Sequence, residues 1–345
     1  MLLLTRTPIR EHADNVAVPE QSRGDPPSPG EPENISAFVA RVLNQLSLSA
    51  WLPGAFLIAS AALILWFRAN RAVSFGGIGS YVQQNWVPVL LLSLPALVIT
   101  TLLTQAFSFD VIRFLEGYWR RRGPASWLRT LCIKHQLRRK HSLVRRNRLA
   151  LSKAFSGVRP LLLAQGIDGL VLLAIEADLA NVRQPFGLSD EQESDVENLR
   201  WVEYCEPWVS ASLIRLRQDL REFPDDSRVM PTKLGNILRV GEDELRNKGG
   251  DVEGFVMRNR EFITPRILEH HDQFRTRLDM YCTLVFVAIG VALISVPTLW
   301  DIAFLDRTVV LMTMIVIAWA SYGAALSSAR GYVTVLRQID TLVSD

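Results

Sequence analysis

Four long blocks without a charged residue limit the fold of this chain more than any other feature. They are residues 42–67, 72–109, 280–300 and 308–329. A membrane-spanning helix needs ~20 mostly apolar residues, and each block supplies that length. Aromatic rings, which anchor spans at the membrane interface, lie near several block ends: Trp51, Trp66, Trp86, Tyr281 and Trp300. A buried helix of a large soluble protein is the alternative for one such block, but four in one chain favour four transmembrane helices.

The blocks fall into two pairs, separated by a long polar region. Residues 68–85 connect the first pair and residues 301–307 connect the second. The sequence therefore predicts an all-α membrane protein with four transmembrane helices in two hairpins and a helical cytosolic domain between them. The expected parts are a disordered N-terminal tail (1–40), the first hairpin (41–109), the cytosolic domain with its basic segment (110–279), the second hairpin (280–329) and a C-terminal tail (330–345). The tail is expected to be disordered because residues 11–34 are rich in Pro, Gly and acidic residues and poor in apolar ones.

Lysine and arginine near the span ends predict the orientation. The two connecting loops hold Arg68, Arg71 and Arg307. The other side holds many more: Arg113, Arg120, Arg121, Arg122, Arg129, Arg260, Arg266, Arg275 and Arg277. Cytoplasmic loops carry the excess of these residues. We therefore expect a multi-pass protein of the cell inner membrane with both termini in the cytoplasm.

Residues 120–153 contain many basic residues and no acidic one, although the whole chain has a net charge of only +3. Basic residues close to a span bind anionic lipid head groups, at about 1 kcal/mol each. Apolar residues fall on one side of a helix through this stretch: Ile133, Leu137, Val144, Leu151 and Phe155. This pattern predicts a basic amphipathic helix on the cytoplasmic leaflet. Its expected lipid-facing residues are Arg138, Arg139, Lys140, Arg145 and Arg146.

Nucleic acid is the other polyanion that such a stretch could bind. Single strands stack on aromatic side chains, and only Trp119, Trp127 and Phe155 are available here. No recognition-module signature is present, so the membrane interpretation is favoured over nucleic acid. The acidic run at residues 190–197 could pair with the basic stretch, but a solvated loop is the favoured interpretation.

The remaining polar region has helical periodicity. Residues 158–183 are strongly apolar but contain three acidic residues, which are costly inside a membrane span. We therefore expect one or two packed helices here, in preference to a span or a re-entrant segment. Further along, Thr232 after Pro231 is a plausible helix N-cap. Gly235 and Gly241 lie within this helix despite the cost of glycine there, so we expect another backbone to approach closely.

This last stretch carries a motif. It resembles a motif of a bacterial family of multi-pass membrane proteins. The residues that carry the resemblance are Phe223-Pro224, then Pro231-Thr232-Lys233-Leu234-Gly235-Asn236-Ile237-Leu238-Arg239, and the acidic residues Glu242 and Glu244. The motif residues singled out are Pro231, Thr232, Leu234, Gly235, Asn236 and Arg239. The family's Tyr-Gly-Asp and Trp-Pro-Arg-Leu elements are replaced here by "GGD" and "FVMRNREF". The resemblance implies a cytosolic motif ahead of a transmembrane hairpin and no particular activity.

Signatures of catalysis and of cofactor binding are absent from the sequence. It has no GxxxxGK[ST], HExxH, GxSxG or GxGxxG. Cys132 and His135 lack a second ligand pair, and the adjacent residues 269–272 ("EHHD") point around a helix rather than at one ion. We therefore expect no enzyme activity, no cofactor and no metal, and we interpret "EHHD" as polar residues of a helix beside the membrane.

The span cores contain no ionisable residue, which disfavours transport. In the fourth block the pairs Ala320/Ala324 and Ser321/Ala325 fit small-residue packing. Their expected partners are Gly290 and Ala292 of the third block, or a second copy in a homo-oligomer.

The function predicted from these features is an interaction or scaffold role, in which the cytosolic domain meets an unknown cytosolic protein and the hairpins hold it at the membrane. The alternative is a membrane effector or pore triggered through the cytosolic domain, and a membrane-embedded enzyme ranks third.

Overall fold

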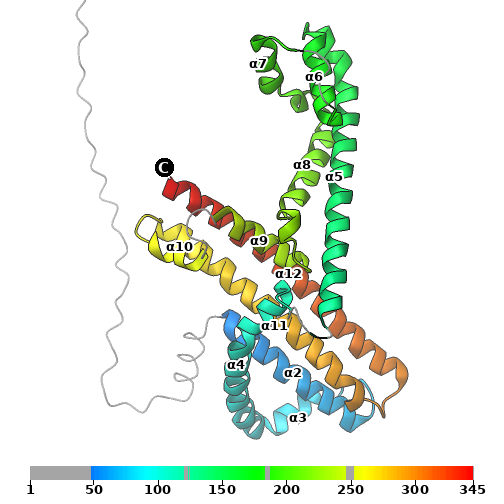
Figure 1. Cartoon of the computed structure of the whole chain (residues 1–345). Coiled ribbons are helices and arrows are strands. Elements are labelled where there is room, and N and C mark those ends of the chain that lie inside the picture. The colour runs from blue at the N-terminus through cyan, green and yellow to red at the C-terminus, as the bar shows by residue number, and fades with distance from the viewer. Residues whose placement is uncertain (1–47, 120–122, 124, 183–186, 246–251, 345) are drawn as a thin grey trace, which may run out of the picture. The chain divides into compact units, whose positions relative to one another are not determined.

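The computed structural model describes residues 48–119, 123, 125–182, 187–245 and 252–344. All regular elements within these residues are helices (Figure 1). The longest are α2 (Leu48–Asn70), α4 (Trp86–Glu116), α5 (Ala125–Ala164), α11 (Pro265–Thr298) and α12 (Phe304–Ser344). The shorter ones are α3 (Ile78–Gln84), α6 (Gly169–Ala180), α7 (Asp190–Asn198), α8 (Pro207–Arg221), α9 (Lys233–Leu245) and α10 (Val252–Arg258). Two 3-10 turns lie at Trp201–Tyr204 and Asp226–Arg228. The predicted N-terminal tail lies outside the described residues.

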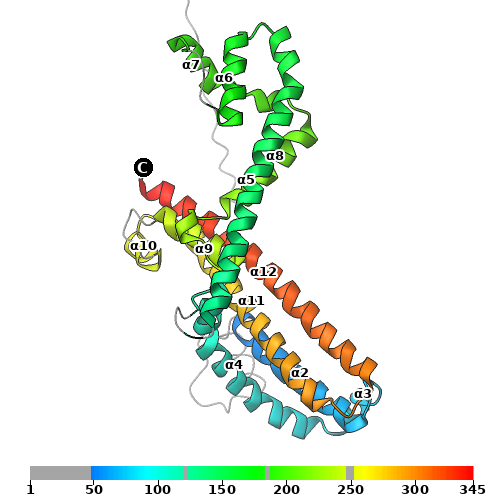
Figure 2. The ribbon, with the colours of Figure 1, turned by 45° about the vertical axis from the view of Figure 1, so that its right-hand side comes forward.

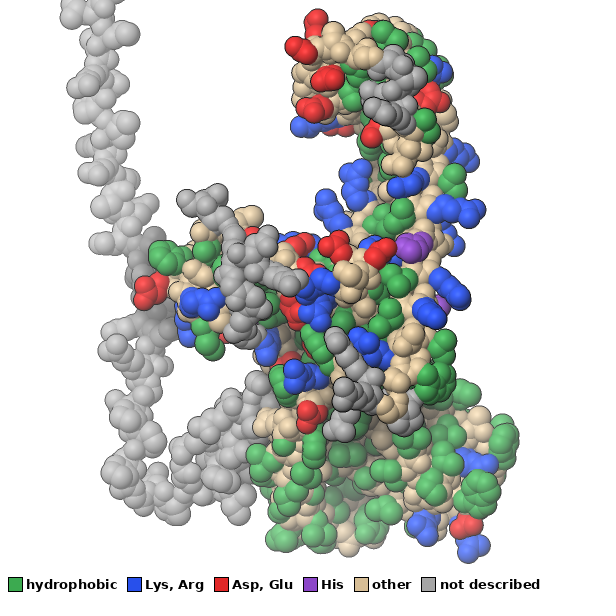
Figure 3. Space-filling model, in the orientation of Figure 1, with side chains coloured by type: hydrophobic (Ala, Val, Ile, Leu, Met, Phe, Trp, Pro, Cys, Tyr) green, Lys and Arg blue, Asp and Glu red, His purple; other side chains and the backbone are tan. Residues whose placement is uncertain are grey.

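Four of the described helices are long and apolar enough to cross a membrane. The stretches are Trp51–Asn70, Trp86–Glu116, Pro265–Thr298 and Phe304–Val343. The predicted helical fold and the four membrane-length helices are therefore confirmed. Figure 3 shows apolar side chains gathered in the lower part of the view, where these helices lie, Lys and Arg side chains along α5, and acidic side chains at the upper end over α6 and α7.

The four apolar helices pack as neighbours in a defined order. α11 lies between α2 and α12, and α4 packs on α2 and α11 (Figure 2). α2 and α4 approach closely at Gly54, where an added Cβ would lie 2.9 Å from Oγ1 of Thr101. The turn that follows α2 also meets the start of α12, because the amide of Val73 donates to the carboxylate of Asp306 in the first turn of α12 over 3.2 Å.

Three of these helices continue past the charge-free blocks. α4 ends at Glu116, α11 begins at Pro265 and α12 runs to Ser344. Residues 330–344 of the predicted C-terminal tail (330–345) form the last turns of α12. Tyr332, Leu336 and Ile339 are buried there. Hydropathy locates the apolar part of a helix, whereas these turns are amphipathic and bury one side against other helices.

Residues 110–279, expected to form one domain, pack in two separate places. α5 to α8 (125–221, the α5–α8 region) enclose a small core around Phe155, Leu162 and Leu172. α9 and α10 share their core with the ends of α4, α11 and α12 instead.

Two local expectations can be compared with the α5–α8 region. The apolar stretch 158–183 forms the end of α5 and all of α6, two helices that pack on each other, with Asp168 capping α6 through the amide of Leu170 at 3.0 Å. The acidic run is a helix rather than a loop. Ser189 and Gln192 form a capping box at its start, and acidic residues in a first turn are favoured by the helix dipole.

Candidate functional site

The motif lies at the start of α9 and holds the end of α4. The amide of Gly235 donates to the hydroxyl oxygen of Thr232 over 3.0 Å, so Thr232 is the N-cap of α9. The same hydroxyl donates to the backbone carbonyl of Glu116 over 2.9 Å. The last carbonyls of a helix have no partner within that helix. Thr232 therefore satisfies one group at the start of α9 and one at the end of α4.

Two glycines make this contact sterically possible. A Cβ added to Gly235 would overlap the carbonyl oxygen of Glu116. Gly117 ends α4 with φ of 96°, and a Cβ there would overlap the ring of Pro231. The close backbone approach predicted at Gly235 is present. At Gly241 that expectation is wrong, because the neighbour is the side chain of Val333 on α12. We call Pro231–Arg239 together with Glu116 and Gly117 the α9 junction.

Asn236 and Leu234 are fully buried in the α9 junction. Asn236 is 1% exposed, and its side-chain oxygen accepts a hydrogen bond from the amide of Met230 over 2.7 Å. The amide of Leu234 donates to the hydroxyl of Tyr322 on α12 over 3.4 Å. The motif thus fixes the turn before α9 and ties α9 to α12.

Arg239 connects the motif to a polar group beside α4. Its guanidinium donates to Glu242 over 2.8 Å and to the hydroxyl of Tyr118 over 3.1 Å. Burial raises the pKa of Glu242, and the charge of Arg239 partly opposes that rise. Burial also raises the pKa of Tyr118, and the carboxylate of Glu242 adds to the effect.

A cavity of about 430 Å³ lies between the ends of α4, α9, α10, α11 and α12. Sequence reasoning missed it, because its polar residues come from four separate parts of the chain. It is lined by Phe109, Ile112, Arg113, Glu116, Tyr118, Leu238, Glu242, Val252, Arg275, Leu278, Asp279, Tyr332 and Leu336.

The carboxylates of this cavity lie near guanidinium groups, since the charges of Arg113 and Arg275 act on Glu116 and that of Arg275 acts on Asp279. Within the described residues, the side chains of Glu116 and Asp279 have neither a hydrogen bond nor an ion pair. The guanidinium of Arg113 lies 5.1 Å from the ring centre of Phe109 and 5.6 Å from that of Tyr118, and its charge also acts on Glu116. The cavity therefore presents charged groups of both signs to whatever occupies it.

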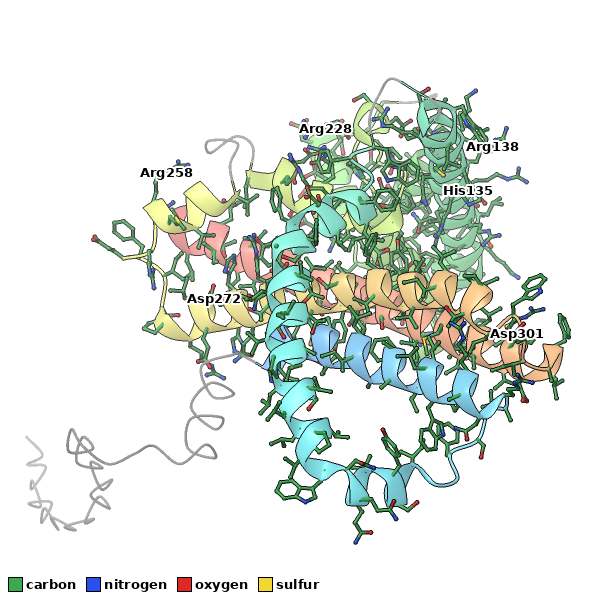
Figure 4. The ribbon with its side chains drawn as sticks, turned by 90° about the horizontal axis from the view of Figure 1, so that it is seen from below. His135, Arg138, Arg228, Arg258, Asp272 and Asp301 are labelled. Carbon is green, nitrogen blue, oxygen red and sulfur yellow. The ribbon has the colours of Figure 1, made fainter. Side chains whose placement is uncertain are left out.

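The basic segment lies on α5, and four of its five predicted lipid-facing residues are exposed: Arg138, Arg139, Arg145 and Arg146. Arg138 points away from the other helices in Figure 4. Lys140 is different, with a side chain only 18% exposed that donates to the carbonyl of Pro224 over 2.8 Å and to Asp226 over 2.6 Å. Lys140 thus holds α5 to the turn before the motif and is not a free lipid-facing cation. Its hydrogen bond, with that of His141, lowers the pKa of Asp226.

The apolar side of α5 packs partly against other helices of the protein. α8 and α6 pack along it, and the ring of Phe155 meets that of Trp201 edge-on at 5.3 Å. The predicted amphipathic helix therefore does not leave this whole side free for a lipid surface. The ion pairs of α5 within the described residues reach Asp226 and Glu176, not the acidic helix α7.

The "EHHD" stretch lies in α11, where His271 is buried rather than solvated. Its Nδ1 is 3.0 Å from Asp272, and its ring centre lies 5.0 Å from that of Tyr332. Among the described residues, no three His, Cys, Asp or Glu side chains gather in a metal-binding arrangement.

The small residues of α12 divide between two sides. Ser321 and Ala325 are buried, whereas Ala320 and Gly323 are exposed. No described residue lies within 4 Å of a Cβ added to Gly290, so the expected contact at Gly290 is not made within the described part of the chain.

The chain matches no protein-family model, no curated protein and no solved structure with which it was compared. The family membership expected from the motif therefore stays a prediction.

Proposed function

We propose that this is a multi-pass protein of the inner membrane, with two hairpins and both termini in the cytoplasm, that binds a cytosolic protein through its α5–α8 region. The spans and the α9 junction would hold that region at the membrane. The arginine and lysine excess on one side of the spans supports this orientation.

One observation carries the interaction role. Four leucines at the turn between α5 and α6 are between 41% and 48% exposed although they lie outside the four spans: Leu161, Leu163, Leu170 and Leu173. Exposed apolar groups concentrated at one place mark sites that meet a protein or a membrane. Asp178 and Glu176 follow on the same helix, and such acidic residues favour a protein partner over an anionic lipid surface.

Photo-crosslinking in living cells tests this role. A photoreactive residue at Leu173 should give a discrete protein adduct, and the same residue at Ser152, which is also exposed, should give little. Leu170→Ser should weaken the adduct because it removes a neighbouring apolar side chain. Adducts with lipid alone would place the leucines on the membrane and contradict the proposal.

Cysteine accessibility tests the orientation separately. Cysteines at Ser80 and Asp306 should react with an impermeant reagent added outside, and a cysteine at Asp190 should react only after permeabilisation. Outside labelling at Asp190 would contradict the two-hairpin topology.

A further inference from the structure

We propose that the cavity beside the α9 junction binds the headgroup of an aminophospholipid, that is, a phosphodiester joined to a primary ammonium group. This site is independent of the interaction role of the α5–α8 region. The proposal rests on where the cavity lies, on the unpaired charges within it and on the state of its aromatic rings.

The position of the cavity suits an amphiphile. Apolar residues form part of the wall: Phe109, Ile112, Leu278 and Leu336. Phe109 is 59% exposed and belongs to the apolar surface of α4, which other helices cover only sparsely. A molecule with its headgroup among the charged residues could therefore lay its acyl chains along α4. A volume of about 430 Å³ is ample for such a headgroup.

The charges indicate which headgroup would be bound. Glu116 and Asp279 are partly buried carboxylates that make no hydrogen bond or ion pair within the described part of the chain, although the charge of Arg275 acts on both. A carboxylate withdrawn from water without a hydrogen bond is costly, and an ammonium group with three N–H donors would supply one. Arg113 makes no ion pair with either carboxylate, and its guanidinium is suited to a phosphate oxygen.

A purely anionic headgroup fits less well. Among the described lining residues, Glu242 is already paired with Arg239, which leaves the carboxylates of Glu116 and Asp279 facing the guanidinium groups of Arg113 and Arg275. A headgroup with a phosphate alone would add a negative charge beside these carboxylates and would offer them no hydrogen-bond donor.

A quaternary ammonium headgroup also fits less well, since such groups are recognised by open aromatic faces. The ring of Tyr118 already lies beside two guanidinium groups, those of Arg113 and Arg239, each 5.6 Å from its centre. The ring of Tyr332 packs against His271. The unpaired groups are carboxylates, which accept hydrogen bonds that a trimethylammonium group cannot donate.

Native mass spectrometry of the full-length protein in detergent tests the proposal. Phosphatidylethanolamine should remain bound at least about tenfold more tightly than phosphatidylcholine or phosphatidylglycerol of the same chain length. Asp279→Asn, which keeps the side-chain shape, should reduce phosphatidylethanolamine binding about tenfold, and Arg113→Gln should also reduce it. Glu269→Gln, an exposed change on the same helix, should leave binding unchanged. Melting temperatures of the variants would show that the fold is retained.

Three outcomes would overturn the proposal. Equal binding of phosphatidylcholine would remove the role of the primary ammonium group. Unchanged binding by Asp279→Asn would place the lipid elsewhere. Soluble glycerophosphoethanolamine that binds as tightly as the lipid would identify a free small molecule, not a membrane lipid, as the ligand.

Discussion

The α9 junction and the α5–α8 region lie in the same polar stretch of the sequence but are built in different ways. α9 buries more than half of its residues and has backbone atoms in contact with the end of α4. The α5–α8 region has a small core of its own and leaves most of its charged side chains exposed. Lys140 and Asp226 connect the two. The glycine-containing motif therefore fixes α9 to the ends of the membrane-length helices, whereas the basic stretch exposes most of its charged side chains.

Replacing one glycine in the α9 junction and one in the α5–α8 region should have opposite effects on stability. Gly235→Ala puts a Cβ into the carbonyl of Glu116 and should destabilise the full-length protein by ~1–3 kcal/mol, as overpacking does. Gly157→Ala in α5 meets nothing within 4 Å and should stabilise by up to ~1 kcal/mol through helix propensity. Thermal melts in detergent measure both. A rise in melting temperature for Gly235→Ala would show that the close contact does not exist.

Substitutions of Thr232 test the hydrogen bonds that hold α9 to the end of α4. Thr232→Val removes the cap of α9 and the hydrogen bond to Glu116, and should cost about 2 kcal/mol in unfolding free energy. Thr232→Ser keeps the hydroxyl and should recover most of that stability. Equal melting temperatures for the two variants would mean that the hydroxyl is not used.

Two ion pairs to α12 provide the next test. Glu222 is largely buried and binds Lys233 at 3.1 Å and Arg330 at 2.6 Å. Glu222→Gln should cost about 1–2 kcal/mol, since it weakens hydrogen bonds between charged groups. Glu244 and Arg337 are both 41% exposed, so Glu244→Gln should cost less than about 1 kcal/mol. Denaturation of both variants compares them, and a larger loss for Glu244→Gln would reverse the ranking.

The smallest expected effect is the pH dependence of stability, which should have opposite sign for Glu242 in α9 and for Asp226 in the turn that binds α5. The raised pKa of Glu242 means that this group contributes stability below the usual pKa of glutamate, which is lost as pH rises through the folded-state value. The lowered pKa of Asp226 means that its contribution is present above the usual pKa of aspartate and is lost as pH falls through the folded-state value. Melting curves across acidic pH should show that Glu242→Gln and Asp226→Asn change the pH dependence in opposite directions. Changes in the same direction would contradict this.

The sequence predicts the spans and the motif contact well because both depend on local rules. Charge-free length identifies the four helices, and a glycine retained inside a helix indicates close packing at Gly235. The sequence does not indicate which backbone approaches Gly235, since Glu116 lies far away in the chain. Nor does the sequence indicate that Lys140, which was expected to face lipid, binds Asp226, because Asp226 is 86 residues further along.

The cavity could not be predicted from the sequence at all. Glu116, Glu242 and Asp279 are each unremarkable near a span or in a polar helix. Only the packing of α4, α9 and α11 brings them to one wall. The buried position of His271 likewise follows from α12, whose last turns look polar in sequence but cover α11 and α9.

Disulfide trapping between α9 and the end of α12 tests the central claim, that the motif helix is packed on the extended spans. A Cβ at Gly241 lies 3.6 Å from the Cβ of Val333, within the range that disulfides require. Gly241→Cys with Val333→Cys should therefore form a disulfide in native membranes under mild oxidation, detected by mass spectrometry of unreduced peptides. Gly157→Cys with Val333→Cys should not. Absence of the first disulfide, or equal yields for the two pairs, would contradict the account.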